Sequence, residues 1–410
     1  MTTNARAAKE PATDTTTFPL VPERQGFLQR QITNIRHGEL GAMPVILALA
    51  AIWIFFSINQ PLFLSSRNLT NLLLQAAVVG TLAMGLTIVL LLGEIDLSIA
   101  AVAGVCAALM AQLLTGDMPV WLVLGVTLVT GIAIGAFQGF FVSVARVPSF
   151  VVTLAGLLGF QGLMLILLGD NGAINVDNPF VRSLTTTFLS PVAGYGLAVI
   201  VLLVYIGTSL WNRKQRTAAD LPVVPLQSLF VKVIVLAVLS LAVITLLNSY
   251  AGLPLIVVLV LALCGILTWV LQRTKYGRYV YAVGGNPEAA RRAGINLIGM
   301  RMSAFMILGL VIALGGIFGA SRYASVSFNA FAGGSLMLEA IGAAVIGGTS
   351  LFGGRGRIMN AILGALVIGS LSNGLDLQGA GSAQKLMFSG GILLLAVTLD
   401  AVSRRGRSRA

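Results

Sequence analysis

Long apolar runs are the feature that most constrains what this chain can fold into. About 20 residues of helix cross the hydrocarbon core of a bilayer, and runs of that length recur between residues 42 and 401. Hydrophobic residues make up 57% of the 410 residues and charged residues only 10%, whereas soluble domains carry about 25% charged residues. The sequence therefore predicts an all-α integral membrane protein, built as a polytopic helical bundle.

The runs divide the chain into three parts and about twelve transmembrane spans. We expect a polar cytosolic N-terminal segment at 1–41, a transmembrane domain at 42–401 and a basic cytosolic tail at 402–410. The predicted spans are 42–58, 70–92, 97–115, 119–144, 148–168, 191–211, 229–247, 253–271, 302–320, 335–350, 358–375 and 385–401. The tenth span is short and rich in glycine, so it fits a half-helix or re-entrant segment as well as a full span.

The distribution of basic residues predicts the orientation. With the N-terminus inside, an even number of spans also places the C-terminus inside. Of the 26 lysine and arginine residues, only Arg67, Arg182, Arg322 and Lys385 then lie outside. This agrees with the excess of basic residues in cytoplasmic loops of membrane proteins. Topology thus explains the net charge of +12, and we expect no nucleic-acid partner.

The fourth predicted span carries a row of small residues, Gly131, Gly135 and Gly139. Small residues four apart let two helix backbones approach closely in lipid. The row therefore predicts a helix-packing face, against either another helix of this chain or a second copy of it.

The residues needed for catalysis are missing from the predicted spans. The segment GGTSLFGGRG at 347–356 looks like a phosphate-binding loop but lacks the lysine. The single histidine, His37, precedes the first span, so no buried imidazole can act as a base or a metal ligand. Cys106 and Cys264 lie in apolar runs and are expected to be free thiols. We therefore expect no enzyme activity, no cofactor and no metal.

Acidic residues lie within or beside several spans, where ionisable groups usually have a function. Glu94 and Asp96 belong to GEIDLS at 93–98, and Asp96 is predicted to cap the third span; Glu339 follows Ser335 at the start of the tenth. The GEIDLS segment is either a polar helix junction or a helix break whose backbone lines a pathway. No oppositely charged pair is expected in mid-membrane, which argues against an ion-coupled carrier.

The polar segment GGNPEAARRAGI at 284–295 predicts a very short helix. Asn286 is a good N-cap, Pro287 suits the first helical position, and Glu288 places negative charge at the positive end of the helix dipole. Gly294 can take the left-handed conformation that ends a helix. The helix is only about 10 Å long and should not be stable alone in water. It is therefore either a docking element for a partner that hydrolyses ATP or an ordinary basic loop that holds the topology.

Three segments closely resemble the permease subunits of bacterial sugar ABC importers, the ribose and xylose permeases. They are GEIDLS at 93–98, GGNPEAARRAGI at 284–295 and GGTSLFGGRGRIMNAILGALVIGSLSNG at 347–374. The resemblance implies the fold of the large (type II, vitamin B12 importer-like) ABC permeases, with about ten spans per subunit. It also implies a homodimer in the inner membrane, cytosolic ABC ATPase subunits and a periplasmic sugar-binding protein.

The same resemblance assigns a coupling helix that contacts the ATPase, within a cytosolic loop at 272–301. Its residues here are Gly285, Asn286, Pro287, Glu288, Ala289, Ala290, Arg291, Arg292 and Gly294. A neutral sugar needs no counter-charge, so small polar residues at helix breaks would suffice for a pathway. The predicted pathway residues are Glu94, Asp96, Ser98, Glu339, Thr349, Ser350 and Asn373.

The chain is longer than ribose-type permeases, and the extra residues fall at about 183–250, as two spans around the basic loop 213–216. Such an insert resembles the xylose permease branch, which makes D-xylose the first expected substrate. Arabinose, galactose, glucose and ribose stay open as alternatives. Two other classes also stay open: an ion-coupled secondary sugar carrier, and a membrane scaffold that transports nothing.

Overall fold

The computed structural model describes nearly all of the chain from residue 43 onward. The described residues are 43–116, 118–221, 223, 225–332, 335–381, 383–391, 394, 397 and 398. Contacts divide the chain into two units, Met1–Gly41 and Ala42–Ala410. The first unit, the predicted tail at 402–410 and the last part of the predicted twelfth span lie outside the described residues.

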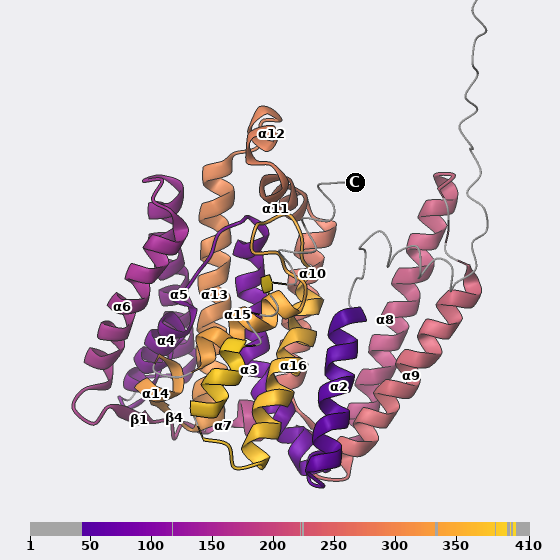
Figure 1. Ribbon diagram of the computed structural model, residues 1–410, viewed down its shortest axis with the longest axis horizontal. Helices are drawn as coiled ribbons and strands as arrows, with labels where there is room; N and C mark the ends of the chain where they lie inside the picture. The colour runs from indigo at the N-terminus through magenta and orange to yellow at the C-terminus, as the bar shows by residue number, and fades with distance from the viewer. Residues whose placement is uncertain are drawn as a thin grey trace, which may run out of the picture. The chain divides into compact units, whose positions relative to one another are not determined.

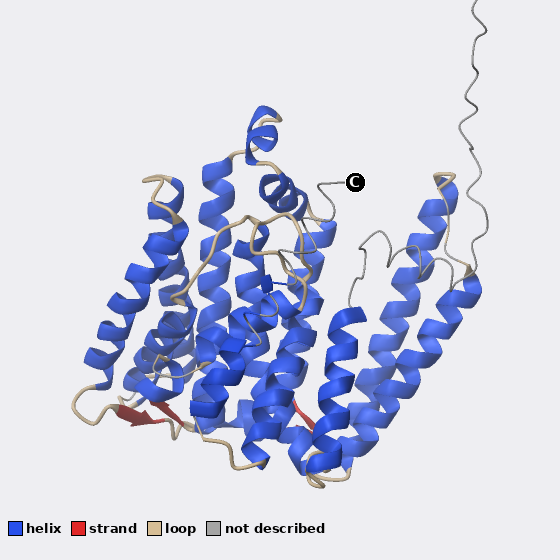
Figure 2. Cartoon of the chain, viewed as in Figure 1, coloured by secondary structure: helices blue, strands red, loops and turns tan. Residues whose placement is uncertain are grey.

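The described part of the second unit is a bundle of helices with two very small sheets (Figure 1; Figure 2). The helices of its first half are α2 (Met43–Asn59), α3 (Ser66–Leu91), α4 (Ile99–Leu114), α5 (Val120–Ser143), α6 (Ser149–Leu168), α7 (Pro179–Thr186), α8 (Pro191–Ala218) and α9 (Leu226–Asn248). Those of its second half are α10 (Leu255–Arg273), α11 (Lys275–Gly285), α12 (Pro287–Arg292), α13 (Leu297–Tyr323), α14 (Phe328–Phe331), α15 (Leu336–Ile346) and α16 (Ile358–Leu377).

Among the described residues, nine helical segments are long and apolar enough to cross a membrane. They are α3, α5, α6, α8, α9, α10, α13, the segment from α14 to α15, and α16. Two more apolar helices are shorter, α2 with 17 residues and α4 with 16. The all-α polytopic fold predicted from the sequence is confirmed, while the number of crossings stays a prediction.

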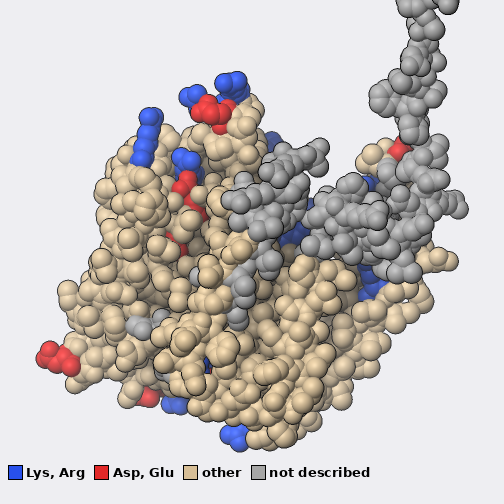
Figure 3. Space-filling model, viewed as in Figure 1, with Lys and Arg blue, Asp and Glu red and all other residues tan. Residues whose placement is uncertain are grey.

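The two ends of the bundle differ (Figure 1). Helix α12 lies beyond the long helices at the top of the view, with α11 just below it, and we call this the α12 end. Helix α7 and both sheets lie near the other end, the α7 end. There β1 (Ala173–Asn175) pairs antiparallel with β4 (Ser325–Ser327), and β2 (Phe188–Leu189) with β3 (Leu253–Pro254). On the face shown in Figure 3, charged side chains gather mainly toward the ends and leave a broad uncharged band between them.

Helix α3 is at the centre of the bundle. In its most apolar stretch 89% of the residues are buried, and it packs against α13, α15, α16 and α10. Its sequence, from Asn71 onward, is apolar on nearly every side, which is the pattern of a helix surrounded by other helices. Ser65 caps the helix, its hydroxyl accepting from the backbone N–H of Asn68 at 3.3 Å.

The glycine row of α5 packs against α13 of the same chain. A Cβ added at Gly135 would collide with the carbonyl oxygen of Phe305, and one at Gly131 with that of Gly309. At Gly139 the nearest atom would be the Cα of Met302, 3.2 Å away. The predicted helix-packing face is therefore confirmed, and its partner is a helix of this chain.

Helices α8 and α9 form a peripheral hairpin in the region where the sequence predicted extra spans. Only 6% of the residues in the most apolar stretch of each helix are buried. They pack mainly against each other, and the hydroxyls of Tyr195 and Thr245 lie 3.0 Å apart between them. The hairpin therefore turns almost all of its apolar surface outward.

Helices α15 and α4 are short and each adjoins a break in the helical structure. Helix α15 has 11 residues, about 16 Å at 1.5 Å per residue, but with α14 it belongs to the segment Phe328–Ile346, which is long and apolar enough to cross; the half-helix there stays a prediction. Helix α4 begins only after the segment 92–98 has run from the α12 end into the bundle (Figure 1). Interrupted helices of this kind bring backbone groups into the interior of a membrane protein.

Candidate functional site

Helix α12 has the local structure that its sequence predicts. The side-chain oxygen of Asn286 accepts from the backbone N–H of Ala289 at 3.0 Å, and Pro287 is the first helical residue. Gly294 ends the turn with a φ of 83°. Within the helix, Nη2 of Arg291 lies 3.0 Å from Oε2 of Glu288, and both side chains are about two-thirds exposed.

The surface of α12 points away from the bundle. Ala290 is buried, with 4% of its surface exposed. The other predicted coupling residues are exposed, namely Gly285, Asn286, Pro287, Glu288, Ala289, Arg291, Arg292 and Gly294. Because the helix has only six residues and only Ala290 among them is buried, it gains little stability from packing against its own chain. Its geometry suits a knob that a partner protein can grip.

Helix α11 connects this knob to the bundle. Val280 and Val283 are completely buried, and the hydroxyl of Tyr281 donates to the carbonyl oxygen of Gly356 at 2.8 Å. Burial raises the pKa of Tyr281, although the charge of Arg357 opposes the shift. The phenol therefore stays a neutral hydrogen-bond donor at neutral pH.

Three glycine-rich segments meet directly below α12, at a place that we call the glycine junction. It is formed by Gly93 after α3, Gly284 at the end of α11, and Gly353 and Gly354 between α15 and α16. The N–H of Gly354 donates to the carbonyl oxygen of Leu91 at 2.8 Å. A Cβ on Gly353 would lie 2.8 Å from the oxygen of Gly284 and 3.0 Å from the nitrogen of Gly93. Three of these glycines also have positive φ: 81° at Gly93, 89° at Gly353 and 73° at Gly354, so only glycine fits without strain.

The cap that the GEIDLS segment predicts for α4 is wrong. Ser98, and not Asp96, is the N-cap residue of α4. The backbone N–H and the hydroxyl of Ser98 each donate to Oδ1 of Asp96 at 2.6 Å, and the amide of Gln138 donates to the Ser98 hydroxyl at 2.7 Å. Oδ1 of Asp96 thus bonds Ser98 in a local turn, as aspartate side chains often do, while Oδ2 is buried without a hydrogen-bond partner in the described structure.

The rest of the segment is held by two other helices. In α6, the hydroxyl of Ser149 accepts from the N–H of Ile95 at 3.1 Å, and that of Thr153 donates to its carbonyl at 3.2 Å. From α13, Nε of Arg301 lies 2.8 Å from Oε1 of Glu94. This ion pair could not be predicted from the sequence, because nothing in the spacing of two distant charges shows that they meet.

The segment between α15 and α16 folds back on itself. The N–H of Ser350 donates to the carbonyl of Arg355 at 2.9 Å, and the Ser350 hydroxyl accepts from the N–H of Phe352 at 3.3 Å. The hydroxyls of Thr349 and Thr87 lie 3.5 Å apart. Thr349 and Ser350 therefore close a loop against α3.

The other two predicted pathway residues lie nearer the α7 end. Oε1 of Glu339 accepts from the hydroxyl of Ser335 at 2.6 Å and from that of Ser372 at 3.4 Å. The amides of Asn68 and Asn373 bond each other reciprocally, at 2.7 and 3.0 Å. The structure thus separates the predicted pathway residues into two sets, and all seven are buried with partners in their own chain.

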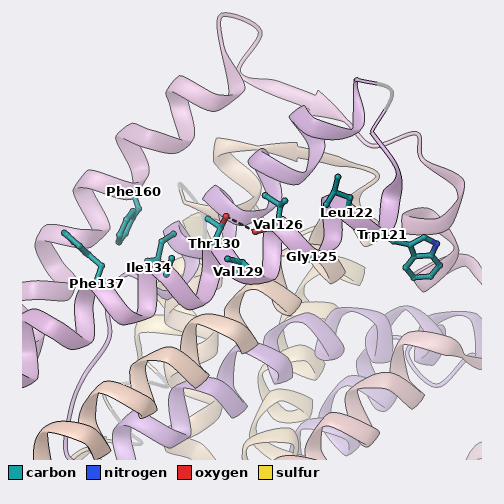
Figure 4. A pocket seen from close by; sticks show the side chains of 10 residues that line it. Trp121, Leu122, Gly125, Val126, Val129, Thr130, Ile134, Phe137 and Phe160 are labelled. Atoms are coloured by element: carbon teal, nitrogen blue, oxygen red, sulfur yellow. Dashed lines mark hydrogen bonds between the residues drawn. The ribbon is translucent and has the colours of Figure 1, made fainter.

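An apolar groove runs along the outer face of α5 beside α6 (Figure 4). Its volume is about 720 Å³, and its lining is Trp121, Leu122, Gly125, Val126, Val129, Thr130, Ala133, Ile134, Phe137 and Phe160. Thr130 carries the only side-chain hydroxyl, which already donates to the carbonyl of Val126 at 2.9 Å. Such a surface offers nothing to the hydroxyls of a sugar and suits apolar matter instead.

The described part of the chain gives no reason to place a metal or a disulfide in it. Among the described residues, no group of three or more histidines, cysteines, aspartates or glutamates could hold a metal ion. Cys106 and Cys264 are free and buried, as the sequence predicts.

Two interrupted helices that converge below an exposed surface helix, inside a polytopic bundle, define a class of protein: a helical membrane transporter. The comparison with protein families is more specific. The chain belongs to the family described as branched-chain amino acid transport system / permease component, whose model matches residues 68–397. The protein is accordingly a multi-pass permease component of an inner membrane and not an enzyme.

Several permeases are similar over almost their whole length. The xylose transport system permease protein of Escherichia coli is 35% identical over 390 residues, which cover 94% of this chain and 96% of that protein. That of Haemophilus influenzae is 37% identical, over 88% of this chain and 96% of its own. The ribose import permease protein of Bacillus subtilis is 30% identical, over 88% and 94%. No solved structure matches the chain.

Proposed function

We propose that this chain is the membrane-spanning permease subunit of an ATP-driven importer for a monosaccharide, with D-xylose as its first substrate. The similarity to xylose permeases supports this assignment, because it extends through 94% of the chain and includes the α8–α9 region. Ribose is the second choice, since ribose permeases are similar over a slightly shorter part of the chain.

The glycine junction below α12 is the observation that carries the proposed mechanism. The segments on either side of α12 touch both interrupted parts of the bundle, 92–98 and 347–357. Displacement of α12 by an ATPase can therefore reach both helix breaks directly. Accordingly, the coupling residues are those of α12 with Gly285, Asn286 and Gly294, in a cytosolic loop at 272–301.

The partners follow from this role. A cytosolic ABC ATPase would grip α12, and a periplasmic binding protein would deliver the sugar at the α7 end. A second copy of the chain would complete the pathway, which the seven buried polar residues would line only after the bundle opens. Both termini would be cytosolic, because the excess of basic residues belongs on that side.

Uptake by proteoliposomes tests the proposal. The chain would be reconstituted with its ATPase and binding protein, and labelled xylose uptake measured with ATP, without ATP, and with a proton or sodium gradient alone. We expect uptake with ATP only, and unlabelled xylose should compete better than ribose, arabinose, galactose or glucose. Uptake driven by an ion gradient would show a secondary carrier, and no uptake under any condition would favour a scaffold.

The docking role of α12 has its own test. Glu288→Arg reverses the charge at the exposed start of the helix, where negative charge is favourable, and should lower capture of the ATPase about tenfold. Asp177→Arg makes the same change at an exposed site near the α7 end and should leave capture unchanged. Full capture and transport by the Glu288 variant would contradict the assignment of α12.

A further inference from the structure

We propose that the ion pair between Glu94 and Arg301 links α12 mechanically to the start of α4, with Glu94 and Arg301 as positioning residues for transport. The inference rests on the proposed function, because it concerns how displacement of α12 by an ATPase reaches the helix breaks. It adds a pair of residues that lie outside the coupling helix itself.

Helix α12 forms one connected unit with the helices on either side of it, α11 and α13. The hydroxyl of Ser303 in α13 donates to that of Tyr276 in α11 at 3.4 Å. The N–H of Ile295, just before α13, donates to the carbonyl of Ala290 in α12 at 3.1 Å. Asn296 then caps α13 by accepting from the N–H of Gly299 at 3.0 Å. A force on α12 is therefore shared by α11 and α13.

Both flanks of α12 contact the same short segment, residues 91–94. On the α11 side, Gly284 lies against the carbonyl of Leu91, where a Cβ would collide with that oxygen. On the α13 side, Arg301 pairs with Glu94. Because the two contacts lie only a few residues apart in the segment 91–94, α12 cannot shift relative to this segment without breaking one of them.

The ion pair between Glu94 and Arg301 is partly shielded from water. The side chain of Glu94 is 11% exposed and that of Arg301 is 29% exposed, so water screens their attraction less than it screens a surface pair. Nε of Arg301 makes no hydrogen bond in the described structure, although it lies 2.8 Å from the carboxylate. A partly buried ion pair in direct contact resists separation, which suits a link between two moving parts.

The segment 91–94 leads directly to the start of α4. Beyond Glu94, only Ile95 to Ser98 separate the ion pair from α4, and Ser98 is bonded to Asp96 and to Gln138 of α5. These residues contain no helix that could absorb a displacement, and close-packed interiors pass strain on. Movement of α12 would thus act on the N-terminus of α4, the interrupted helix beside the centre of the bundle.

Charge exchange at the pair tests the linkage in the reconstituted complex. The variants are Glu94→Gln, Arg301→Gln, and the exchanged double variant Glu94→Arg with Arg301→Glu. For each we would measure ATPase capture, the stimulation of ATP hydrolysis by sugar-loaded binding protein, and sugar transported per ATP hydrolysed. Arg216→Gln, which removes an exposed charge from the peripheral helix α8, is the control.

Both single variants should capture the ATPase normally but transport roughly tenfold less sugar per ATP, a size usual for coupling between distant sites. The exchanged variant should recover to within about threefold of the wild type, and Arg216→Gln should equal the wild type. A purely structural pair would lower the amount of folded protein without changing the ratio of sugar to ATP.

Two outcomes overturn the linkage: single variants with the wild-type ratio, or an exchanged variant as uncoupled as the singles. If instead wild-type uptake needs no ATP, the proposed function fails and the variants are not at issue. The two failures are therefore distinguishable.

Discussion

Two pairs of neighbouring helices in this protein are packed in opposite ways. Helices α5 and α13 approach until glycine backbones touch, and Gly131, Gly135 and Gly309 leave no room for a Cβ. Helices α8 and α9 lie side by side with most of their Leu, Val and Ile side chains exposed. Of the glycines in α8, Gly196 and Gly207 have no atom within 4 Å of an added Cβ.

The difference shows what holds helices together in lipid. Lipid tails are as apolar as leucine, so burying an apolar side chain between helices gains little. Close backbone contact and polar bonds provide the attraction instead. The α5–α13 pair has such contact along a buried shared face, whereas the α8–α9 hairpin lacks it and stays at the periphery. Four predictions test this comparison, from the largest expected effect to the smallest.

Gly135→Leu should have the largest effect. The new side chain would collide with the backbone of Phe305, so α5 and α13 would have to separate, at a cost of about 3 kcal/mol or more. We expect at least a tenfold loss of monodisperse protein in detergent, roughly in line with that cost. Gly125→Leu, in the same helix but with nothing within 4 Å of its Cβ position, should give the wild-type yield. Equal yields of the two variants would refute the packing argument.

Asn68→Ala removes a polar bond inside the core. It leaves the buried amide of Asn373 without its partner, which should lower the free energy of unfolding by about 2 kcal/mol. Unfolding in detergent mixed with increasing sodium dodecyl sulfate would measure the loss. The double variant Asn68→Ala with Asn373→Ala should lose less than the sum of the two single variants, and strict additivity would show that the two amides do not interact.

Removal of the whole α8–α9 hairpin should disturb the protein less than loss of the bond between Asn68 and Asn373. Leu189 and Leu253 are directly paired in the β2–β3 ladder, so Asn-Gly can replace residues 190–252 as a two-residue turn. We expect ATP-dependent uptake within about threefold of the wild type, since α8 and α9 contribute few contacts to the core. Failure of the shortened chain to insert would show that the hairpin supports the fold.

Tyr195→Phe should have the smallest effect. It removes the bond between the hydroxyls of Tyr195 and Thr245 in the hairpin, and single interhelical bonds in a membrane contribute about 0.6 kcal/mol on average. The same unfolding assay should show a decrease of roughly that size. A loss as large as that of Asn68→Ala would remove the contrast between hairpin and core.

Local signals let several features be predicted correctly. Asn286 and Pro287 start a helix whatever surrounds them, and the structure has the cap, the first residue and the final glycine where the sequence placed them. The same Asn-Pro signal stands at Asn178 and Pro179, where it starts α7. Sequence reasoning overlooked that second helix, although the signal was available. The roles assigned to α12 and to the pathway residues remain predictions.

Features that depend on the path of the chain or on distant residues were missed. Asp96 looked like a cap for α4, but the chain bends at that point and its carboxylate bonds Ser98 instead. The sequence places Glu94 in a polar segment at the end of a span, but its pairing with Arg301 appears only in the structure. The local path of the chain decided the first partner and a distant segment supplied the second, so charge or spacing alone could identify neither.

The sequence by itself determined that the chain is a membrane protein, because its apolar runs are long enough to cross the hydrocarbon core of a bilayer. It also determined the start and end of α12 and the face of α5 that packs, because caps and small residues act over one or two turns of helix. Only the tertiary structure decided that Gly93, Gly284 and Gly353 meet at one point below α12. Each of the three segments carries the flexibility for close contact, but the folding of α3, α11 and α15 brings them together.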